Sequence, residues 1–291
     1  MTTAAPQAWT TRRLLAWIGG KLRERDIDDA RLCAEMLVAH VLGCERLRLY
    51  MEADRPASAD ELAMLRELVR RALSHEPVQY LVGEASFYGI SLLVDRRVLI
   101  PRPETQTLVD EVVAAIKPIA APRVADVCTG TGCVAIAVAK QAPHAVVNAG
   151  DIDDDALAVA GDNLERTGVA DRVSLHAGDL LGALPEDSTY HAIAANPPYI
   201  PDDEWAGVAA NVRDFEPEHA LRGGVDGMDL VRRLIDDAPQ RLEPGGVLAI
   251  EVASTRAALA LEIAEASGRY AEARMVRDFA GRPRVLVARL G

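Results

Sequence analysis

From about residue 103 to the C-terminus, short runs of β-forming residues alternate with longer segments of helical periodicity, and this alternation most strongly constrains the fold. A strand, a helix and a second strand in this order form a βαβ unit, whose strands lie parallel in one sheet. We expect strands at 123–127, 145–150, 172–177, 190–195 and 246–252, and helices at 104–117, 132–141, 153–167, 226–241 and 255–267.

The C-terminal end of the chain breaks this alternation. Two strand-like segments, 273–279 and 284–290, are separated by a Gly-Arg-Pro turn that is too short to contain a crossover helix. A connection of this length allows only an antiparallel pair. We therefore expect an α/β fold whose sheet is mostly parallel and contains one antiparallel strand near its end.

The first 75 residues have apolar stripes at helical spacing and no strand-like run. Thr11 is a candidate N-cap of the first helix, and Gly43 is a candidate end of the second. Ser58 and Glu61 have the spacing of a capping box ahead of the third helix. We expect the chain to divide into a helical bundle at 1–75, a β-hairpin connector at 76–100 and an α/β domain at 101–291.

The composition argues against several classes of function. Acidic residues number 44 and basic residues 32, which gives a formal net charge of −12, and aromatic residues make up 4% of the chain. A general nucleic-acid-binding protein has a basic face, and a base-stacking surface needs many aromatic rings. No apolar run approaches the roughly 20 residues of a membrane span, and the N-terminal segment has no hydrophobic signal core. We therefore expect a cytoplasmic protein that contacts neither nucleic acid nor membrane directly.

The four cysteines give no sign of a metal site or a disulfide framework. They form no C-x-x-C pair, and histidines are sparse around them. Structural zinc sites are built from closely spaced cysteines and histidines, and this chain lacks such a pattern. We expect reduced thiols and no metal.

A glycine-rich turn follows the first strand of the α/β domain, in the sequence ADVCTGTGCVAIAVA at 125–139. Glycines let the backbone turn sharply and let a ligand lie directly against it. Gly130, Gly132 and Ala135 match the G-x-G-x-x-G/A pattern of nucleotide-binding folds. Asp151, at the end of the next strand, has the position of a carboxylate that binds ribose hydroxyls. These residues predict a nucleoside-bearing cofactor without distinguishing NAD from S-adenosylmethionine.

A second motif, Asn196-Pro197-Pro198-Tyr199, directly follows the strand at 190–195. Neither proline can continue the strand, because proline has no backbone N–H for the ladder. The prolines instead fix the backbone and hold its carbonyl groups in set directions. Asn196 adds a side-chain carbonyl, and Tyr199 adds an aromatic face.

This set of groups suits methyl transfer to an amide or exocyclic amino nitrogen. Such a nitrogen is a weak nucleophile, because its lone pair is delocalised into a carbonyl group or a ring. Acceptors that hold both N–H bonds localise the lone pair and orient it, and orientation contributes on the order of 7–11 kcal/mol in the best model reactions. The Tyr199 ring can stabilise the nearby cation. The methylated nitrogen then loses its extra proton readily, so no dedicated base is needed.

The combination of Asn-Pro-Pro-Tyr with D-x-x-T-G-T-G resembles the amide- and adenine-nitrogen methyltransferases of the class I fold. Four further segments, at 77–89, 98–109, 215–235 and 242–251, resemble the HemK/PrmC family, which methylates a glutamine side-chain N5 in peptide chain release factors. The resemblance covers nearly the whole chain from about residue 75, and the N-terminal helical bundle also suits the family. It implies a Rossmann-like methyltransferase fold, S-adenosylmethionine as the cofactor and a class I release factor as the protein substrate.

The resemblance also implies a site with two overlapping parts. By motif match, the cofactor would be bound by Asp126, Cys128, Thr129, Gly130, Thr131, Gly132, Asp151, Asp179, Leu180 and Asn196. The glutamine amide would be held by the catalytic residues Asn196, Pro197, Pro198 and Tyr199, under a loop that contains Arg102, Pro103, Glu104 and Thr105. Glu104 and Thr105 also lie at a predicted helix start, where helix stabilisation explains them equally well.

The chain departs from the family pattern at four positions. The family usually has glycine, glutamate, glycine and glutamine where this chain has Cys128, Gln106, Ala253 and Arg256. Cys128 adds a side chain at the cofactor turn, and we expect it to adopt an ordinary negative φ there. We expect S-adenosylmethionine to bind nevertheless.

Several alternatives remain open from the sequence. The substrate could instead be a glutamine of a ribosomal protein, although the segment at 101–105 argues against it, or an adenine in DNA. The charge of −12 and the lack of a basic recognition domain argue against DNA. A non-catalytic scaffold and an NAD-dependent enzyme are the other possibilities. We expect a monomer whose helical bundle helps to recognise the protein that carries the glutamine.

Overall fold

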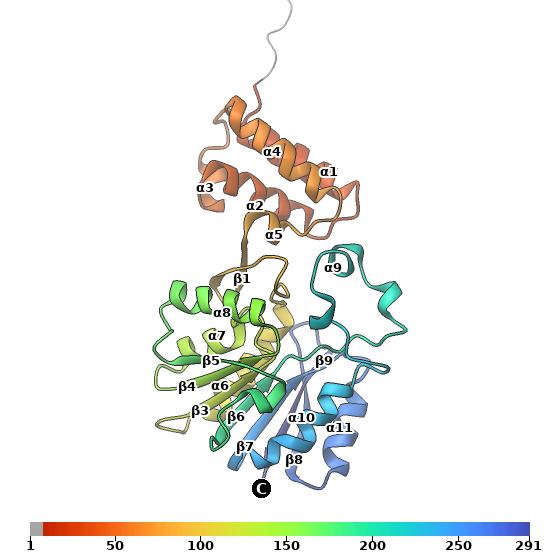
Figure 1. Ribbon diagram of the computed structural model, residues 1–291. Helices are drawn as coiled ribbons and strands as arrows, with labels where there is room; N and C mark the ends of the chain where they lie inside the picture. The colour runs from red at the N-terminus through yellow and green to blue at the C-terminus, as the bar shows by residue number, and fades with distance from the viewer. Residues whose placement is uncertain (1–7) are drawn as a thin grey trace, which may run out of the picture. The chain divides into compact units, whose positions relative to one another are not determined.

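A computed structural model describes residues 8–291, which form two compact units (Figure 1). The helical unit contains the described residues up to Gly83 together with Ala210–Phe215, and the α/β unit contains Glu84–Ala209 and Glu216–Gly291. The start of the N-terminal segment, for which we expect no signal sequence, lies outside the described residues. None of the helices in residues 8–291 is long and apolar enough to cross a membrane.

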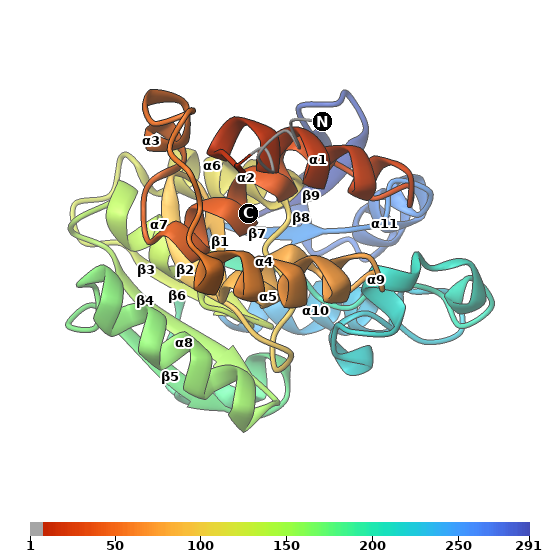
Figure 2. The same ribbon diagram turned by 90° about the horizontal axis from the view of Figure 1, so that it is seen from above.

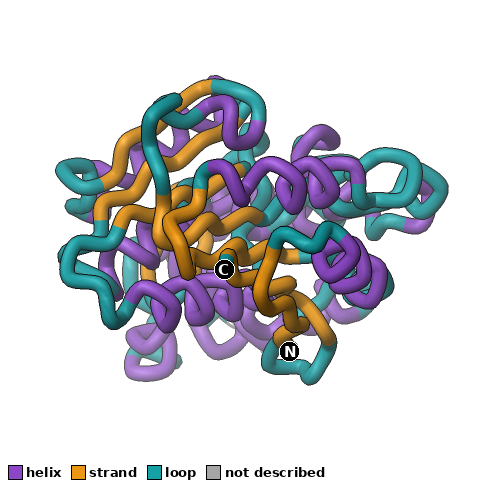
Figure 3. The backbone as a smooth tube through the Cα atoms, turned by 90° about the horizontal axis from the view of Figure 1, so that it is seen from below, coloured by secondary structure: helices purple, strands orange, loops and turns teal. Residues whose placement is uncertain are grey.

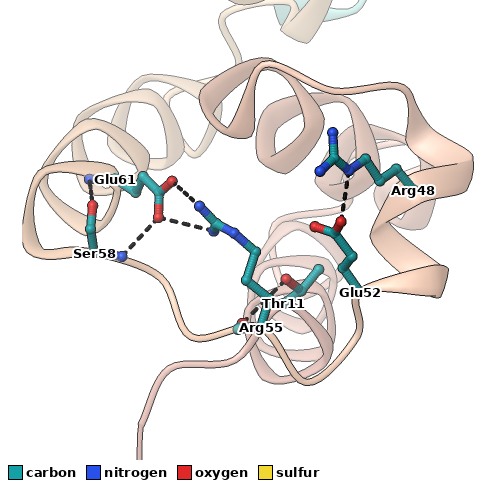
Figure 4. A network of polar contacts seen from close by, with 6 residues as sticks. All are labelled: Thr11, Arg48, Glu52, Arg55, Ser58 and Glu61. Carbon is teal, nitrogen blue, oxygen red and sulfur yellow. Dashed lines mark hydrogen bonds and ion pairs between the residues drawn. The ribbon is translucent and has the colours of Figure 1, made fainter.

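The helical unit contains five short helices around one apolar core, and its sixth helix is α9 (Ala210–Arg213). A capping box starts α4, because Glu61 N donates to Ser58 Oγ (3.2 Å) and Ser58 N donates to Glu61 Oε2 (2.7 Å) (Figure 4). The prediction of Thr11 as the N-cap of α1 is wrong by one residue, since Thr10 accepts the capping bond from Arg13 N. The five helices are α1 (Thr11–Arg23), α2 (Ala30–Leu42), α3 (Arg46–Met51), α4 (Ala59–Ala72) and α5 (Val78–Val82).

The expectation of a β-hairpin connector at 76–100 is wrong for its first part. Residues Val78–Val82 form α5, and its apolar residues Val78 and Leu81 are buried in the core formed by α2 and α4. Burial against helices therefore overrides the local β propensity of this segment. The hairpin itself is shorter than expected, with β1 at Glu84–Phe87 and β2 at Ile90–Leu93.

The α/β unit is built on a seven-stranded sheet with the strand order β5-β4-β3-β6-β7-β9-β8. Only β9 runs antiparallel to its neighbours, β7 and β8, so the predicted fold class is confirmed. Figure 3 shows these strands in orange. The strands are β3 (Arg123–Val127), β4 (Val146–Asp151), β5 (Val173–Ala177), β6 (Tyr190–Ala195), β7 (Leu242–Glu251), β8 (Tyr270–Arg277) and β9 (Pro283–Leu290).

Helices cover both faces of this sheet, which explains why its central strands are almost wholly apolar. Val124 and Ala192 belong to the core under one set of helices, and their neighbours Ala125 and Ile193 belong to the core on the opposite face. Helix α8 packs against β4 and β5, and Figure 2 shows it beside these two strands. The first face is covered by α6 (Gln106–Ile116), α7 (Cys133–Gln141) and α8 (Asp154–Thr167), and the other by α10 (Asp229–Asp237) and α11 (Ala257–Ala266).

The strand order determines where a site can form. From β3 the chain first adds β4 and β5 on one side and then returns to place β6 and β7 on the other. The loops that follow β3 and β6 therefore separate at the carboxyl edge of the sheet, and open α/β sheets bind their ligands at this type of switch point. The glycine-rich turn follows β3, and Asn196-Pro197-Pro198-Tyr199 follows β6.

Candidate active site

A cavity of about 410 Å³ lies at the carboxyl edge of the sheet, within the volume range of small-molecule sites. It is lined by residues from loops that are far apart in the sequence and that meet only at the switch point. From the predicted site, the lining residues are Arg102, Thr105, Cys128, Thr129, Gly130, Thr131, Asp151, Asp179, Leu180, Asn196 and Pro198.

Six of the predicted residues do not line this cavity: Pro103, Glu104, Asp126, Gly132, Pro197 and Tyr199. Asp126 is the clearest case, because its side chain is almost fully buried below the turn. One of its carboxylate oxygens accepts hydrogen bonds from Thr129 Oγ1 (2.6 Å) and Ala135 N (3.0 Å). Burial raises the pKa of this carboxyl to about 7, although both hydrogen bonds favour its ionised form. Asp126 thus shapes the glycine-rich turn from beneath.

The turn is built from residues in the left-handed backbone region. Gly130 has φ +53° and Gly132 has φ +78°, which glycine adopts without steric cost. Cys128 has φ +59°, so the expectation of an ordinary negative φ at this position is wrong. A tight turn after β3 imposes this conformation on whichever residue follows Val127, and the cysteine accepts the strain.

The two glycines of the turn have different surroundings. A side-chain carbon placed on Gly130 would meet nothing within 4 Å, so its backbone is open on the side where a ligand can approach. On Gly132 the same carbon would lie 3.4 Å from Ala160 Cβ of helix α8. Gly132 therefore serves the packing of α7 and α8, and Gly130 serves access to the cavity.

Asp151, the last residue of β4, presents its carboxylate to the cavity. Its Oδ2 accepts from Gly130 N (2.8 Å) and its Oδ1 accepts from Asp153 N (3.1 Å). Burial raises the pKa of Asp151, while the two backbone N–H groups oppose that shift. A carboxylate has about four acceptor positions, so each oxygen retains capacity for a ligand hydroxyl.

Asp179 lies on the same side of the cavity and is paired with a residue that sequence reasoning missed. Arg233 of α10 also lines the cavity, and its Nη2 is 2.6 Å from Asp179 Oδ2. The pair lies beside Leu180, which is 7% exposed. No sequence signal indicated Arg233, because a helical arginine is ordinarily a solvated surface residue.

The residues of the Asn-Pro-Pro-Tyr motif separate into two groups. Asn196 and Pro198 line the cavity, and the Asn196 Nδ2 donates to Thr105 Oγ1 (3.3 Å). Tyr199 turns away, and its hydroxyl donates to Glu251 Oε1 (3.4 Å). Burial raises the pKa of Tyr199 well above its usual range, and the nearby Glu251 carboxylate adds to that effect.

The loop ahead of α6 reaches the cavity through Arg102 and Thr105. Arg102 Nη2 is 2.5 Å from Oε1 of Glu216, a carboxylate that is 5% exposed and also accepts from Ile100 N (3.0 Å). Burial raises the pKa of Glu216, and Arg102 opposes this shift. Glu216 fixes the loop, and nothing in the sequence connected it to Arg102 across more than one hundred residues.

Glu251 is the other functional candidate that sequence reasoning passed over. It ends strand β7 and is fully buried at the carboxyl edge of the sheet. An acidic residue directly after the apolar run at 247–250 was the available signal, because a buried carboxylate is rare without a specific role.

The arrangement combines an open glycine-rich backbone, a strand-end carboxylate and a carboxamide on one cavity. The first two suit a nucleoside-bearing ligand, and the third suits a group that donates N–H bonds. Among residues 8–291 there is no cluster of three side chains able to hold a metal ion.

Two family models match the chain. The PrmC N-terminal domain matches residues 13–83, and the methyltransferase small domain matches residues 104–212. The second match contains the glycine-rich turn and the Asn-Pro-Pro-Tyr motif.

Curated relatives match over nearly the full length. The chain is 41% identical to the release factor glutamine methyltransferase of Rhodopirellula baltica, over 98% of this chain and 97% of that protein. It is 38% identical to the protein of the same name from Geobacter sulfurreducens, over 99% and 100% respectively.

Among solved structures, the N-terminal domain of human METTL16 in complex with SAH has a similar fold. The TM-score is 0.52 at 19% identity, and the match covers 69% of this chain and 76% of that one.

Proposed function

The chain belongs to the family of release factor glutamine methyltransferases, and from this membership we propose that it transfers a methyl group from S-adenosylmethionine to the side-chain N5 of a glutamine in a class I peptide chain release factor. The proposal rests above all on one juxtaposition: the Asn196 carboxamide and the open turn at Gly130 line the same cavity. We place this activity in the cytoplasm, where release factors act.

The cavity fits S-adenosylmethionine in size and in chemistry. Gly130 leaves backbone exposed where a ligand can lie against it, and the Asp151 carboxylate has spare acceptor capacity for ribose hydroxyls. Leu180 offers an apolar surface for the adenine, with Asp179 beside it. When bound, the cofactor supplies an electrophilic methyl group on a positively charged sulfur. Cys128, Thr129 and the other turn residues would hold its methionine part.

The residues of this chain then prepare the glutamine nitrogen. Its lone pair is delocalised into the amide carbonyl, so it attacks only when it is well oriented. Asn196 Oδ1 and the backbone carbonyls of the Asn-Pro-Pro segment can accept both N–H bonds and hold the nitrogen in place. On methylation the nitrogen releases one of its two protons, and the neutral N-methyl amide is the product.

The position of Tyr199 supports a role other than the expected contact with the substrate. Its hydroxyl is directed to Glu251, and its side chain is not part of the cavity lining, so we propose that it supports Asn196 and Pro198 from behind. Pro197, which is buried, would act in the same way. The substrate contacts would then come from Asn196, Pro198 and Arg102.

We also propose that the helical unit recognises the folded release factor. A glutamine must enter the cavity on an extended loop, and such a loop contacts too little surface to select one protein among many. The boundary of this recognition domain would lie after Gly83, because α5 belongs to the helical core.

A transfer assay with radiolabelled S-adenosylmethionine tests the choice of substrate. We expect label on release factor and none on ribosomal proteins or on plasmid DNA, which the charge of −12 already disfavours. Label on ribosomal protein or on DNA in place of release factor would contradict the proposed substrate. Asn196→Ala should abolish transfer while leaving the protein folded; unchanged transfer would contradict the role of the carboxamide.

A further inference from the structure

A chain of polar side chains connects the carboxyl end of β7 to the substrate side of the cavity. Glu251, fully buried at the end of β7, accepts from Tyr199 OH (3.4 Å), and the Thr105 hydroxyl acts on it as a donor that lowers its pKa. Thr105, which is 1% exposed, accepts in turn from Asn196 Nδ2 (3.3 Å). Glu251 therefore reaches Asn196 through one hydroxyl, and it reaches the Asn-Pro-Pro-Tyr segment a second time through Tyr199.

The chemistry of these groups determines which of them donates and which accepts in each contact. An ionised carboxylate only accepts hydrogen bonds, so the protons of Thr105 and Tyr199 both point to Glu251. Because the hydroxyl proton of Thr105 is directed to Glu251, its oxygen can only accept a hydrogen bond from Asn196. The NH₂ group of the Asn196 carboxamide is the side that can donate it. The Asn196 Oδ1 then lies on the opposite side of the carboxamide, where it can accept a hydrogen bond from a substrate.

We propose that Glu251 is a positioning residue for methyl transfer: acting through Thr105, it holds the Asn196 carboxamide in the orientation that presents Oδ1 to the glutamine amide. This inference rests on the proposed function. Glu251 itself does not line the cavity, so its effect is carried by Thr105 and Asn196.

Packing alone does not explain a carboxylate at this position. Glu251 Oε2 is buried and has no hydrogen-bond partner among the described residues, which is unfavourable for folding. The run directly before it, residues 247–250, is apolar and buried, and Leu248 and Ile250 belong to the core under α10 and α11. An apolar residue could continue that core without the unsatisfied oxygen, so the carboxylate contributes something other than stability.

The surroundings of Glu251 make its orienting effect dependent on pH. Burial raises the pKa of Glu251 to about 7, with a further contribution from Glu104, while Thr105, Tyr199 and Arg284 lower it. Cys133 also faces this carboxylate and stays protonated, because burial raises its pKa to about 12. Above pH 7 the carboxylate accepts from Thr105. Below it, a protonated Glu251 can donate to Thr105, whose own proton then opposes the Asn196 NH₂ group.

The test compares pH profiles of kcat on release factor at saturating S-adenosylmethionine. We expect wild-type kcat to fall as the pH drops through about 7, and Glu251→Gln to remove this fall. Saturating cofactor separates the effect from Asp126 and Asp151, whose titration would act on cofactor binding. Glu243→Gln, at the opposite end of the same strand, is the matched control and should keep the wild-type profile.

A second pair of variants tests the intermediate hydroxyl. Thr105→Val should lower kcat by about 10- to 100-fold, the usual effect of a small misplacement of a reacting group. Thr105→Ser keeps the hydroxyl and should restore most of the rate. Calorimetry should find cofactor affinity within about twofold of wild type for these variants, since the loss belongs to orientation in the reaction step.

The outcomes separate the two proposals. If wild-type protein transfers no methyl group to release factor, the proposed function is wrong and the positioning role is wrong with it. If wild-type protein is active but Glu251→Gln keeps the acidic fall in kcat, or Thr105→Val keeps full kcat, only the positioning role is contradicted. A fall in cofactor affinity that accounts for the whole loss would contradict it as well.

Discussion

At the scale of single residues, Cys128 shows the limit of reading a motif by composition. The sequence places a cysteine in the glycine-rich turn, and a negative φ angle is the usual expectation for a residue with a side chain. The turn instead holds Cys128 at φ +59°, in the region that glycine prefers. Local propensity yields here to the geometry of the sheet edge, as is common at functional sites.

Replacing Cys128 by glycine should therefore stabilise the protein. Relief of the left-handed strain contributes about 1 kcal/mol, reduced by the greater entropy of glycine in the unfolded chain. Urea unfolding at equilibrium measures the difference. Cys128→Ala retains the side-chain carbon that causes the strain and is the matched control, so equal stabilities of the two variants would refute this explanation.

Asp151 leads to a prediction about the cofactor. Asp151→Ala removes a carboxylate that supports Gly130 N and has capacity for ribose hydroxyls. Loss of these hydrogen bonds to a charged group should weaken S-adenosylmethionine binding by roughly 10- to 100-fold, which is about 1.5–3 kcal/mol. Isothermal titration calorimetry measures the affinity. The exposed Asp171→Ala serves as control, and wild-type affinity in Asp151→Ala would show that the carboxylate is not a ligand of the cofactor.

At the scale of elements, the sequence was informative wherever a pattern repeats over several residues. The strands of the sheet, the helices between them and the antiparallel β9 follow from periodicity and from the length of the last turn. Short elements were not predictable in the same way. Val78–Val82 has β-forming residues, yet it forms a helix because Val78 and Leu81 fit the apolar core of the helical unit.

The site could be predicted only in part for a related reason. Residues within one motif, such as Gly130 and Asn196, were found from their local pattern. Partners brought in by the fold were not. Arg233, Glu216 and Glu251 lie in segments that resemble the family, but no local pattern indicated that these side chains reach the site. The one usable clue was the acidic residue at the end of β7.

The capping box of α4 allows a test of stability at this scale. Ser58→Ala removes the acceptor for Glu61 N and should lower the stability of the helical unit by about 1 kcal/mol. Thermal unfolding followed by circular dichroism measures this effect. Ser74→Ala, past the end of the same helix, should cost less, and an equal loss in both variants would show that the cap is unimportant.

At the scale of the whole molecule, the candidate site lies within one of the two units. The α/β unit contains every residue of the candidate site, and the helical unit contains none of the cavity lining. The net charge of −12 suits a protein substrate better than DNA. Few aromatic residues are needed, because orienting one amide requires a single carboxamide and rigid backbone carbonyls.

Removing the N-terminal helices α1 to α5 tests the recognition role proposed for the helical unit. Deletion of residues 1–83 should reduce methylation of intact release factor more than methylation of a short glutamine peptide, since only the intact factor offers a surface for recognition. Comparing kcat/KM for the two substrates measures the effect. Equal losses on both substrates would mean that the helical unit supports folding alone.

The central claim is that this chain methylates a glutamine side chain in a release factor. Tandem mass spectrometry of a class I release factor, incubated with the protein and S-adenosylmethionine, tests it most directly. We predict one added methyl group, assigned to a glutamine side-chain nitrogen and absent when Asn196→Ala replaces the wild-type protein. A release factor that remains unmodified, or that carries its methyl group on another residue type, would contradict the claim.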